Sequence, residues 1–344
     1  MTSRTASHAG SWYSSSKSKL SSQLDDWLEQ VPDSLAGVGE IPCSGARVII
    51  APHAGYAFSG PPAAWAYKSL DLSKAKRIFL LGPSHHVYLS GCALSQCSTY
   101  DTPLGSLTID HATIEELHRT GKFEKMSTQT DEEEHSLEMQ LPYLYKVLSR
   151  AFPSNPASFP PLIPILVGAT TPTAERSYGS LLSPYLRDPS SIFIISSDFC
   201  HWGLRFGYTY YLPHATVNTT NPAPSSGHSL KSSSRTPTSP AIHESIAVLD
   251  KMAMTAVEAG RHEDFLKVLR ETGNTVCGRH PIGVMMAAVE VLKKQDGLDE
   301  SADQDGTAIA KERGKFRFVR YERSSEAVKV GDSSVSYASA FAVL

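Results

Sequence analysis

The sequence predicts a single α/β domain over residues 1–344, with three layers (α/β/α) around a central mixed, largely parallel sheet. Short apolar runs that are rich in Ile, Val, Leu and Phe recur along the chain and stop at Gly, Pro or Ser. Such runs are typical of strands that are buried on both faces. Segments with helical spacing of apolar residues lie between them, and this alternation favours a sheet covered by helices on both sides.

In the first half of the chain, the spacing of apolar residues sets the predicted elements. Leu20, Leu24 and Leu28 fall at helical spacing. Residues 137–148 place four leucines on one helical face, and we expect Pro142 to bend that helix. In chain order we expect helix 16–30, strand 47–51, helix 63–69, strand 77–81, strand 92–100 with a turn over 101–105, helix 110–120 and helix 134–148.

The second half continues this alternation and adds two segments that interrupt it. In chain order we expect strand 162–167, helix 174–186, strand 191–195, helices 242–259, 265–271 and 282–293, and strands 316–321 and 335–343. Residues 212–240 are rich in Pro, Ser, Thr and Asn, so we expect a disordered insertion there. Residues 295–315 are dense in Asp, Glu, Lys and Gly, and we expect a charged, solvated loop.

Composition excludes several classes of partner. The chain has 344 residues, 41% of them hydrophobic, which is enough for a sizeable core. Its net charge is −3 and it shows no basic stripe, so nucleic-acid binding has no electrostatic support. It contains no apolar stretch of about 18 residues, so we expect no membrane span. Its five cysteines show no CxxC spacing, which favours the reducing cytoplasm, with the nucleus as an alternative.

Three of the predicted strands run directly into residues that can bind a metal or move a proton. The strands and the residues that follow them are 47–51 with His53, 77–81 with His85 and His86, and 191–195 with Asp198 and His201. In an open α/β sheet, ligands collect beyond the carboxyl ends of the strands. These imidazoles and this carboxylate should therefore meet at one edge, which predicts a metal or redox site.

Each histidine has a structural alternative to a role as ligand. A single histidine in a turn, such as His53, is more often a hydrogen-bonded structural residue. Adjacent side chains on an extended chain point to opposite sides, so only one of His85 and His86 should face His53. By position we favour His85 as the ligand, with His86 as a donor behind it or a core residue.

The remaining candidates could act as acids, bases or positioning groups. Asp198 could cap a helix, or it could orient an imidazole, as metal-bound histidines commonly require. His201 could move protons. His135 shares a helix face with Glu138, which indicates either a cap with a solvated acidic turn or an acid/base group brought to the sheet edge.

Cys277 lies in a turn before a predicted helix, where the helix dipole can hold a thiolate. The alternative is an inert buried thiol. Two imidazoles with this thiolate would suit copper, zinc or iron. Two imidazoles with Asp198 would instead resemble the facial triad of non-haem iron.

Several stretches of the chain resemble the Memo family, named for mediating cell motility driven by receptor tyrosine kinases. The resemblance covers nearly the whole chain, and the motifs occur in order. They are 6–13 (ASHAGSWY), 51–56 (APHAGY), 81–86 (LGPSHH), 130–131 (TD) with 134–142 (EHSLEMQLP), 196–203 (SSDFCHWG), 276–283 (VCGRHPIG) and 332–338 (DSSVSYA).

The resemblance implies a fold similar to that of class III extradiol (non-haem iron) dioxygenases, with a metal pocket. It implies His53, His85 and Cys277 as ligands of copper or iron, and Asp198 and His201 as pocket residues. Those dioxygenases use a carboxylate as third ligand, so Cys277 in that role argues against ring cleavage.

The resemblance also implies a phosphotyrosine peptide docked near this pocket. Trp12 and residues 56–58, which include Tyr56, would lie there. Phe58 stands where the family often has a tyrosine, and the loss of that hydroxyl removes one polar contact. His86 is a further pocket candidate, and Arg279 is the candidate partner for the phosphate.

These observations support three hypotheses for function. The first is a metal-binding redox protein that exchanges electrons with small oxygen species, or prevents that exchange, and so controls reactive oxygen species and signalling to the cytoskeleton. In it His201, Asp198 and His135 are the acid/base and positioning residues. The second is a phosphopeptide-binding adapter for a signalling protein. The third is an active dioxygenase or a zinc hydrolase that uses metal-bound water.

Overall fold

The structure is a computed structural model that describes residues 2–153, 155–213, 226–295 and 313–344. The predicted insertion 212–240 and the predicted charged loop 295–315 therefore lie partly outside the described residues. At the described ends of the insertion, Leu212 and Leu230 are buried, and β13 (Tyr210–Tyr211) pairs with β14 (His228–Ser229).

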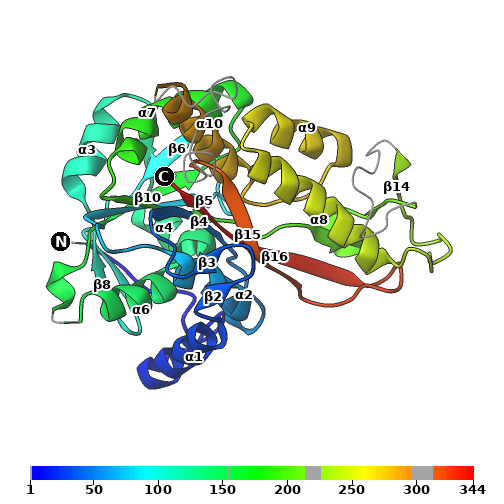
Figure 1. Ribbon diagram of the computed structural model, residues 1–344, viewed down its shortest axis with the longest axis horizontal. Helices are drawn as coiled ribbons and strands as arrows, with labels where there is room; N and C mark the ends of the chain where they lie inside the picture. The colour runs from blue at the N-terminus through cyan, green and yellow to red at the C-terminus, as the bar shows by residue number, and fades with distance from the viewer. Residues whose placement is uncertain (1, 154, 214–225, 296–312) are drawn as a thin grey trace.

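A mixed sheet of nine strands forms the centre of the molecule (Figure 1). Its four middle strands are parallel, because apolar β-branched runs buried on both faces need helical crossovers between them. They are, in spatial order, β4 (Ala46–Ala51), β11 (Ser191–Ser196), β5 (Arg77–Pro83) and β10 (Leu162–Val167). The prediction of a mixed, largely parallel sheet is confirmed.

Antiparallel strands extend this sheet on both sides. Next to β4 lies β16 (Ser333–Val343), which also pairs with β12 (His201–Gly203) and β15 (Phe316–Arg323). Next to β10 lies β6 (Cys92–Leu94), followed by β9 (Phe123–Lys125). The small strands outside this sheet are β1 (Ser3–Arg4), β2 (Ser34–Leu35), β3 (Gly39–Glu40), β7 (Thr99–Thr102) and β8 (Gly105–Thr108).

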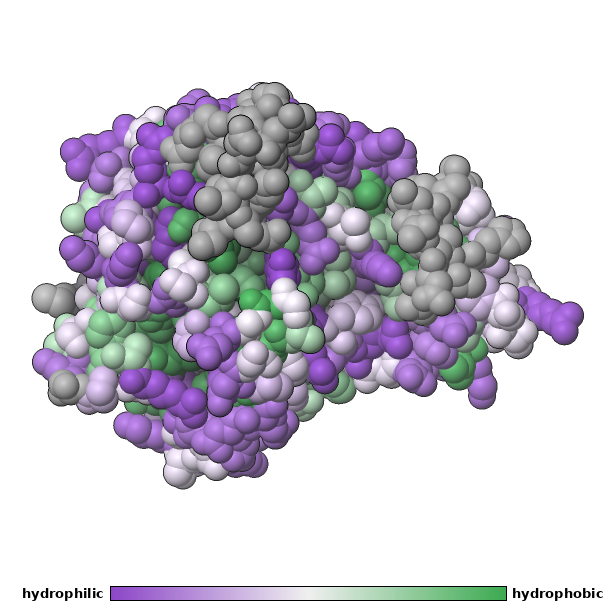
Figure 2. All heavy atoms as spheres, viewed as in Figure 1, coloured by the Kyte–Doolittle hydropathy of each residue, from purple (hydrophilic) through white to green (hydrophobic). Residues whose placement is uncertain are grey.

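Helices cover both faces of the sheet, as the predicted three layers require (Figure 1). One face packs against α7 (Pro172–Arg187) and α10 (Arg279–Gln295), and the other against α2 (Tyr56–Ser69). Figure 2 shows mainly hydrophilic residues on the outer surface of these layers, with apolar side chains gathered between them. The other helices are α1 (Lys17–Gln30), α3 (His111–Arg119), α4 (Thr128–Glu133), α5 (His135–Glu138), α6 (Leu141–Ala151), α8 (Ile242–Ala259) and α9 (His262–Thr272).

The core lies between the middle strands and these helices. Ile49, Phe79 and Ile194 have no exposed surface, and the rings of Phe79 and Phe193 stack with centroids 4.6 Å apart. None of the described helices has the length and apolar character needed to cross a bilayer. All five cysteines are free thiols.

Three predicted elements differ from the structure. Helix α2 begins seven residues before predicted position 63, because Pro61 and Pro62 are tolerated close to its start. The predicted strand 92–100 is two strands, β6 and β7, in different sheets. The predicted helix 134–148 is two helices, α5 and α6, and Pro142 lies in the first turn of α6, where its missing N–H needs no partner.

Candidate metal centre

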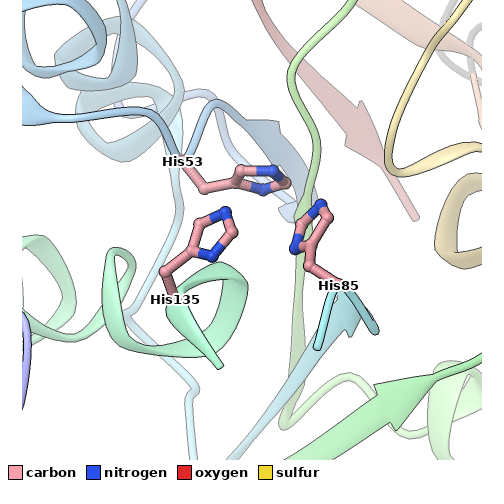
Figure 3. Close-up of side chains that lie close together, drawn as sticks. All are labelled: His53, His85 and His135. Carbon is pink, nitrogen blue, oxygen red and sulfur yellow. The ribbon is translucent and has the colours of Figure 1, made fainter. Parts of the chain in front are cut away.

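Three histidines from separate elements converge beyond the carboxyl edge of the sheet (Figure 3). His53 follows β4, His85 follows β5, and His135 is the first residue of α5. One ring nitrogen from each lies within 4.8 Å of the other two. The rings of His85 and His135 stack with centroids 4.3 Å apart, and His53 meets both at steep angles. This is a group that could hold a metal ion.

The turn that presents His53 is held by Asp198. The backbone N–H of His53 donates to Asp198 Oδ1 at 2.8 Å, and the N–H of Ala54 also bonds to this carboxylate. Burial raises the pKa of Asp198, while His201 and these backbone bonds oppose that rise. Asp198 therefore positions the backbone of a candidate ligand, whereas we expected it to cap a helix or orient an imidazole ring.

Glu134 fixes the orientation of His85. Its carboxylate accepts the backbone N–H of His85 at 2.7 Å, Nδ1–H of the same residue at 2.8 Å, and the N–H of Ser136 at 2.9 Å. Burial alone would raise the pKa of Glu134, but the bonds from His85 and Ser136 lower it to about 2. Because the carboxylate takes Nδ1–H, the lone pair of His85 is on Nε2, the arrangement usual for a metal-bound histidine.

Two of the three imidazoles are uncharged at neutral pH, as metal ligands must be. Burial, reinforced by His85, lowers the pKa of His53 well below its usual value. Burial and His85 also lower the pKa of His135, to about 3. The buried Nδ1 of His135 has no hydrogen-bond partner among the described residues. Neutral, converging imidazoles with one orphaned nitrogen fit a transition-metal ion.

Cys277 contacts this group from the side of His53. Its Sγ lies 3.1 Å from His53 Nε2 and accepts the N–H of Asp198 at 3.1 Å. Burial and the Asp198 carboxylate raise the pKa of the thiol well above its ordinary value. The predicted stabilisation of a thiolate by the helix dipole is therefore wrong, and only a bound cation would stabilise the thiolate here.

A cavity of about 300 Å³ opens beside the histidines. His201 lies on its wall, and Nδ1 of this residue donates to the carbonyl of Phe199 at 2.9 Å rather than to Asp198. Its other nitrogen is thus free of the proton and available as an acceptor. The residues that line the cavity are Trp12, His53, Ala54, His85, His135, Asp198, His201, Phe206 and Val335.

Known proteins that resemble this chain do so over nearly its full length. A family model described as Memo-like protein matches residues 4–341. The chain belongs to the Memo-like family. Protein MEMO1 of Danio rerio is 46% identical over 98% of this chain and 96% of its own length. Protein MEMO1 of Homo sapiens is 45% identical over 97% and 95%.

One solved structure also aligns with this Memo-like chain, at a lower level of similarity. It is an uncharacterized protein, JW3007, from Escherichia coli K12, with a TM-score of 0.42 and 11% identity over 86% of this chain and 99% of its own. No conclusion about this Memo-like protein rests on that likeness.

Of the predicted peptide-binding residues, Trp12 alone lines the cavity beside the histidines. Its ring lies 4.6 Å from that of His135. Tyr56 is buried and faces a neighbouring cavity, where Trp12 is a shared wall. Phe58 and Arg279 are exposed and lie outside the lining of the histidine cavity.

His86 is exposed, yet it is not remote from the centre of this Memo-like protein. It forms a second group of close potential ligands with Glu134 and His135. Sequence reasoning treated His135 only as an acid/base candidate and missed Glu134 as the residue that orients His85. The adjacent Glu-His pair at 134–135 was the available signal, since a carboxylate next to a histidine is a common feature of metal sites.

Proposed function

We propose that this Memo-like protein binds one transition-metal ion, copper or iron, at the histidine cluster and acts as a redox protein. The observation that supports this proposal best is the convergence of His53, His85 and His135 to within 4.8 Å at one ring nitrogen each. Imidazole suits copper, iron and zinc alike, so the metal is chosen on the resemblance that also favours redox chemistry.

His53 and His85 are the two ligands that every observation favours. Cys277 is the third, since metal–nitrogen and metal–sulfur bonds of about 2.0 and 2.3 Å separate two ligands by about 3 Å at a right angle. The separation of 3.1 Å between Cys277 Sγ and His53 Nε2 agrees with that geometry. His135 is a fourth donor, or it lies against the ion on the side of Trp12.

When bound, copper or iron would supply electron transfer to small oxygen species. The residues of the chain would bind and orient that ion and control access to it. His201 would exchange protons through Nε2, because Nδ1 is bonded to the carbonyl of Phe199. Asp198 would hold the turn of His53, and the indole of Trp12 would limit access from solvent.

The test is elemental analysis of protein purified anaerobically without chelator. We expect about one equivalent of copper or iron in the wild-type protein and none in His53→Ala/Cys277→Ala. His111→Ala is the matched control, because His111 is exposed on α3, away from the cluster. Full metal content in the double variant, or none in the wild-type protein after reconstitution, would overturn the proposal.

Two other outcomes correspond to the remaining hypotheses. Absence of metal together with binding of a phosphotyrosine peptide that Trp12→Ala abolishes would indicate an adapter. Turnover of catechols, or of esters and amides with bound zinc, would indicate a dioxygenase or a hydrolase. We propose the cytoplasm as the compartment, with the nucleus as the alternative, since the five free thiols are typical of reducing compartments.

The proposed redox role leads to a proposed cellular one. By controlling reactive oxygen species, this protein would influence signalling to the cytoskeleton. Signalling proteins with phosphotyrosine segments are its proposed partners.

A further inference from the structure

We propose that Ser196 fixes the tautomer of His53, so that the lone pair of this ring lies on Nε2 and faces the metal cluster. Ser196 is the last residue of β11 and has no exposed surface. Its Oγ lies 2.8 Å from His53 Nδ1. A hydroxyl can donate or accept in such a pair, so the direction of this bond must be derived from the other bonds of Ser196.

The single hydrogen of the Ser196 hydroxyl is used elsewhere. Ser196 Oγ donates to the carbonyl of Ser136 at 2.6 Å. That carbonyl belongs to α5, a helix of four residues, in which the carbonyls have no full turn ahead of them to supply N–H donors. The carbonyl can only accept, and the serine hydroxyl is the donor beside it.

The orientation of Gln140 adds a second constraint. Its Oε1 accepts from the hydroxyl of Tyr67 at 2.8 Å, and its Nε2 donates to the carbonyl of Pro52 at 3.0 Å. Both contacts fix which end of the amide bears the hydrogens. Nε2 therefore also donates to Ser196 Oγ, at 2.9 Å.

These bonds leave one role for His53. Ser196 Oγ has one hydrogen, donated to Ser136, and two lone pairs, one of which accepts from Gln140. The second lone pair must accept from His53 Nδ1–H. The neutral ring then has no hydrogen on Nε2, the nitrogen that lies 3.1 Å from Cys277 Sγ.

Ser196 therefore does for His53 what Glu134 does for His85, but with a neutral group. A neutral acceptor suits this position, because Asp198 already supplies a buried carboxylate 2.8 Å from the His53 backbone nitrogen. Ser196 is a positioning residue. Its effect on metal affinity rests on the proposed function, whereas the tautomer is a property of the protein alone.

The experiment is nitrogen NMR of the metal-free protein, labelled with ¹⁵N in histidine, at neutral pH. The ring nitrogens of His53 are assigned by their loss in His53→Gln. We expect Nδ1 to bear the hydrogen in the wild-type protein and Nε2–H to become the major form in Ser196→Ala. In that variant Nδ1–H has no acceptor, while Nε2–H can donate to Cys277 Sγ.

Ser191→Ala is the matched control. Ser191 lies on the same strand, has no exposed surface, and its Oγ has no hydrogen-bond partner among the described residues. We expect it to leave the tautomer of His53 unchanged, and we expect Ser196→Thr, which keeps the hydroxyl, to restore Nδ1–H. An Nε2–H tautomer in the wild-type protein, or an unchanged tautomer in Ser196→Ala, would overturn the proposal.

A second readout separates this inference from the proposed function. If the protein binds metal, Ser196→Ala should lower its affinity by about 10- to 100-fold, as loss of such supporting groups commonly does. If the wild-type protein binds none, the NMR result still decides the tautomer. Failure of the proposed function and failure of this inference are thus distinguishable.

Discussion

The carboxylate of Glu134 binds His85 twice, through the backbone N–H at 2.7 Å and through Nδ1 at 2.8 Å. It is buried, and it lies directly before His135, whose ring stacks on that of His85. One short segment at the start of α5 therefore supplies both a histidine of the cluster and the group that orients another.

Replacement of Glu134 by glutamine tests this arrangement. Glu134→Gln keeps the shape but can turn its NH2 toward Nδ1, which weakens the fixed orientation of His85. We expect metal affinity to fall by about 10- to 100-fold, measured by anaerobic competition titration. Glu133→Gln, at an exposed neighbouring position, should change nothing. Equal affinities for the Glu134→Gln and wild-type proteins would show that His85 needs no such support.

The participation of sulfur can be tested with cobalt(II) as a spectroscopic probe. A Cys277 thiolate bound to the ion would give a sulfur-to-cobalt charge-transfer band in the near ultraviolet. We expect Cys277→Ser to abolish this band and Cys43→Ser, at a half-buried thiol elsewhere, to retain it. A band that survives in Cys277→Ser would leave the three imidazoles as the ligand set.

The turn before α10 tolerates no side chain at Gly278. A Cβ there would lie 2.3 Å from Ser197 Cβ and 2.5 Å from the carbonyl oxygen of Ser196. We expect Gly278→Ala to lower the free energy of unfolding by about 1–3 kcal/mol and to weaken metal binding through displacement of Cys277. Gly331→Ala meets no atom within 4 Å and is the control. Urea denaturation measures both, and equal stabilities would contradict the close approach.

Acid should destabilise the fold through Glu138, which lies outside the histidine cluster. Burial would raise the pKa of Glu138, but bonds from His8, Arg4 and Tyr13 lower it to about 2. A carboxylate whose pKa is depressed in the folded state stabilises the fold above its unfolded pKa. That stability, on the order of 3 kcal/mol, is lost as the pH falls from about 4.5 to 2.

The measurement is the free energy of unfolding as a function of pH, in the wild-type protein and in Glu138→Gln. The variant should be less stable at pH 7 and should lose less stability between pH 5 and 3. Glu29→Gln, at an exposed position on α1, should follow the wild-type curve. Parallel curves for Glu138→Gln and the wild-type protein would show that Glu138 is not the titrating group.

Sequence patterns predicted the sheet and two of its site residues for a physical reason. The runs at 47–51, 77–81 and 191–195 are buried along their whole length, so their hydrophobicity alone marks them as inner strands. Because these strands are parallel, the residues after them meet at one edge. This brought His53 and His85 together as expected.

His135 and Ser196 were harder to assign. The leucine spacing of 137–148 suggested one continuous helix, whereas the chain breaks between α5 and α6, and this break aims the start of α5 at His85. Ser196 resembles an ordinary strand end, and its role depends on Gln140 and Ser136, which are distant in sequence. Such hydrogen-bond networks are set by tertiary packing, which local patterns do not encode.

The most direct test of the metal centre is anomalous diffraction from crystals of the protein purified with its metal, recorded above and below the absorption edge of that metal. We predict one anomalous peak, within about 2.5 Å of a ring nitrogen of both His53 and His85. Crystals whose metal gives its peak away from these two residues, or that contain no peak although the dissolved protein binds the ion, would contradict the account.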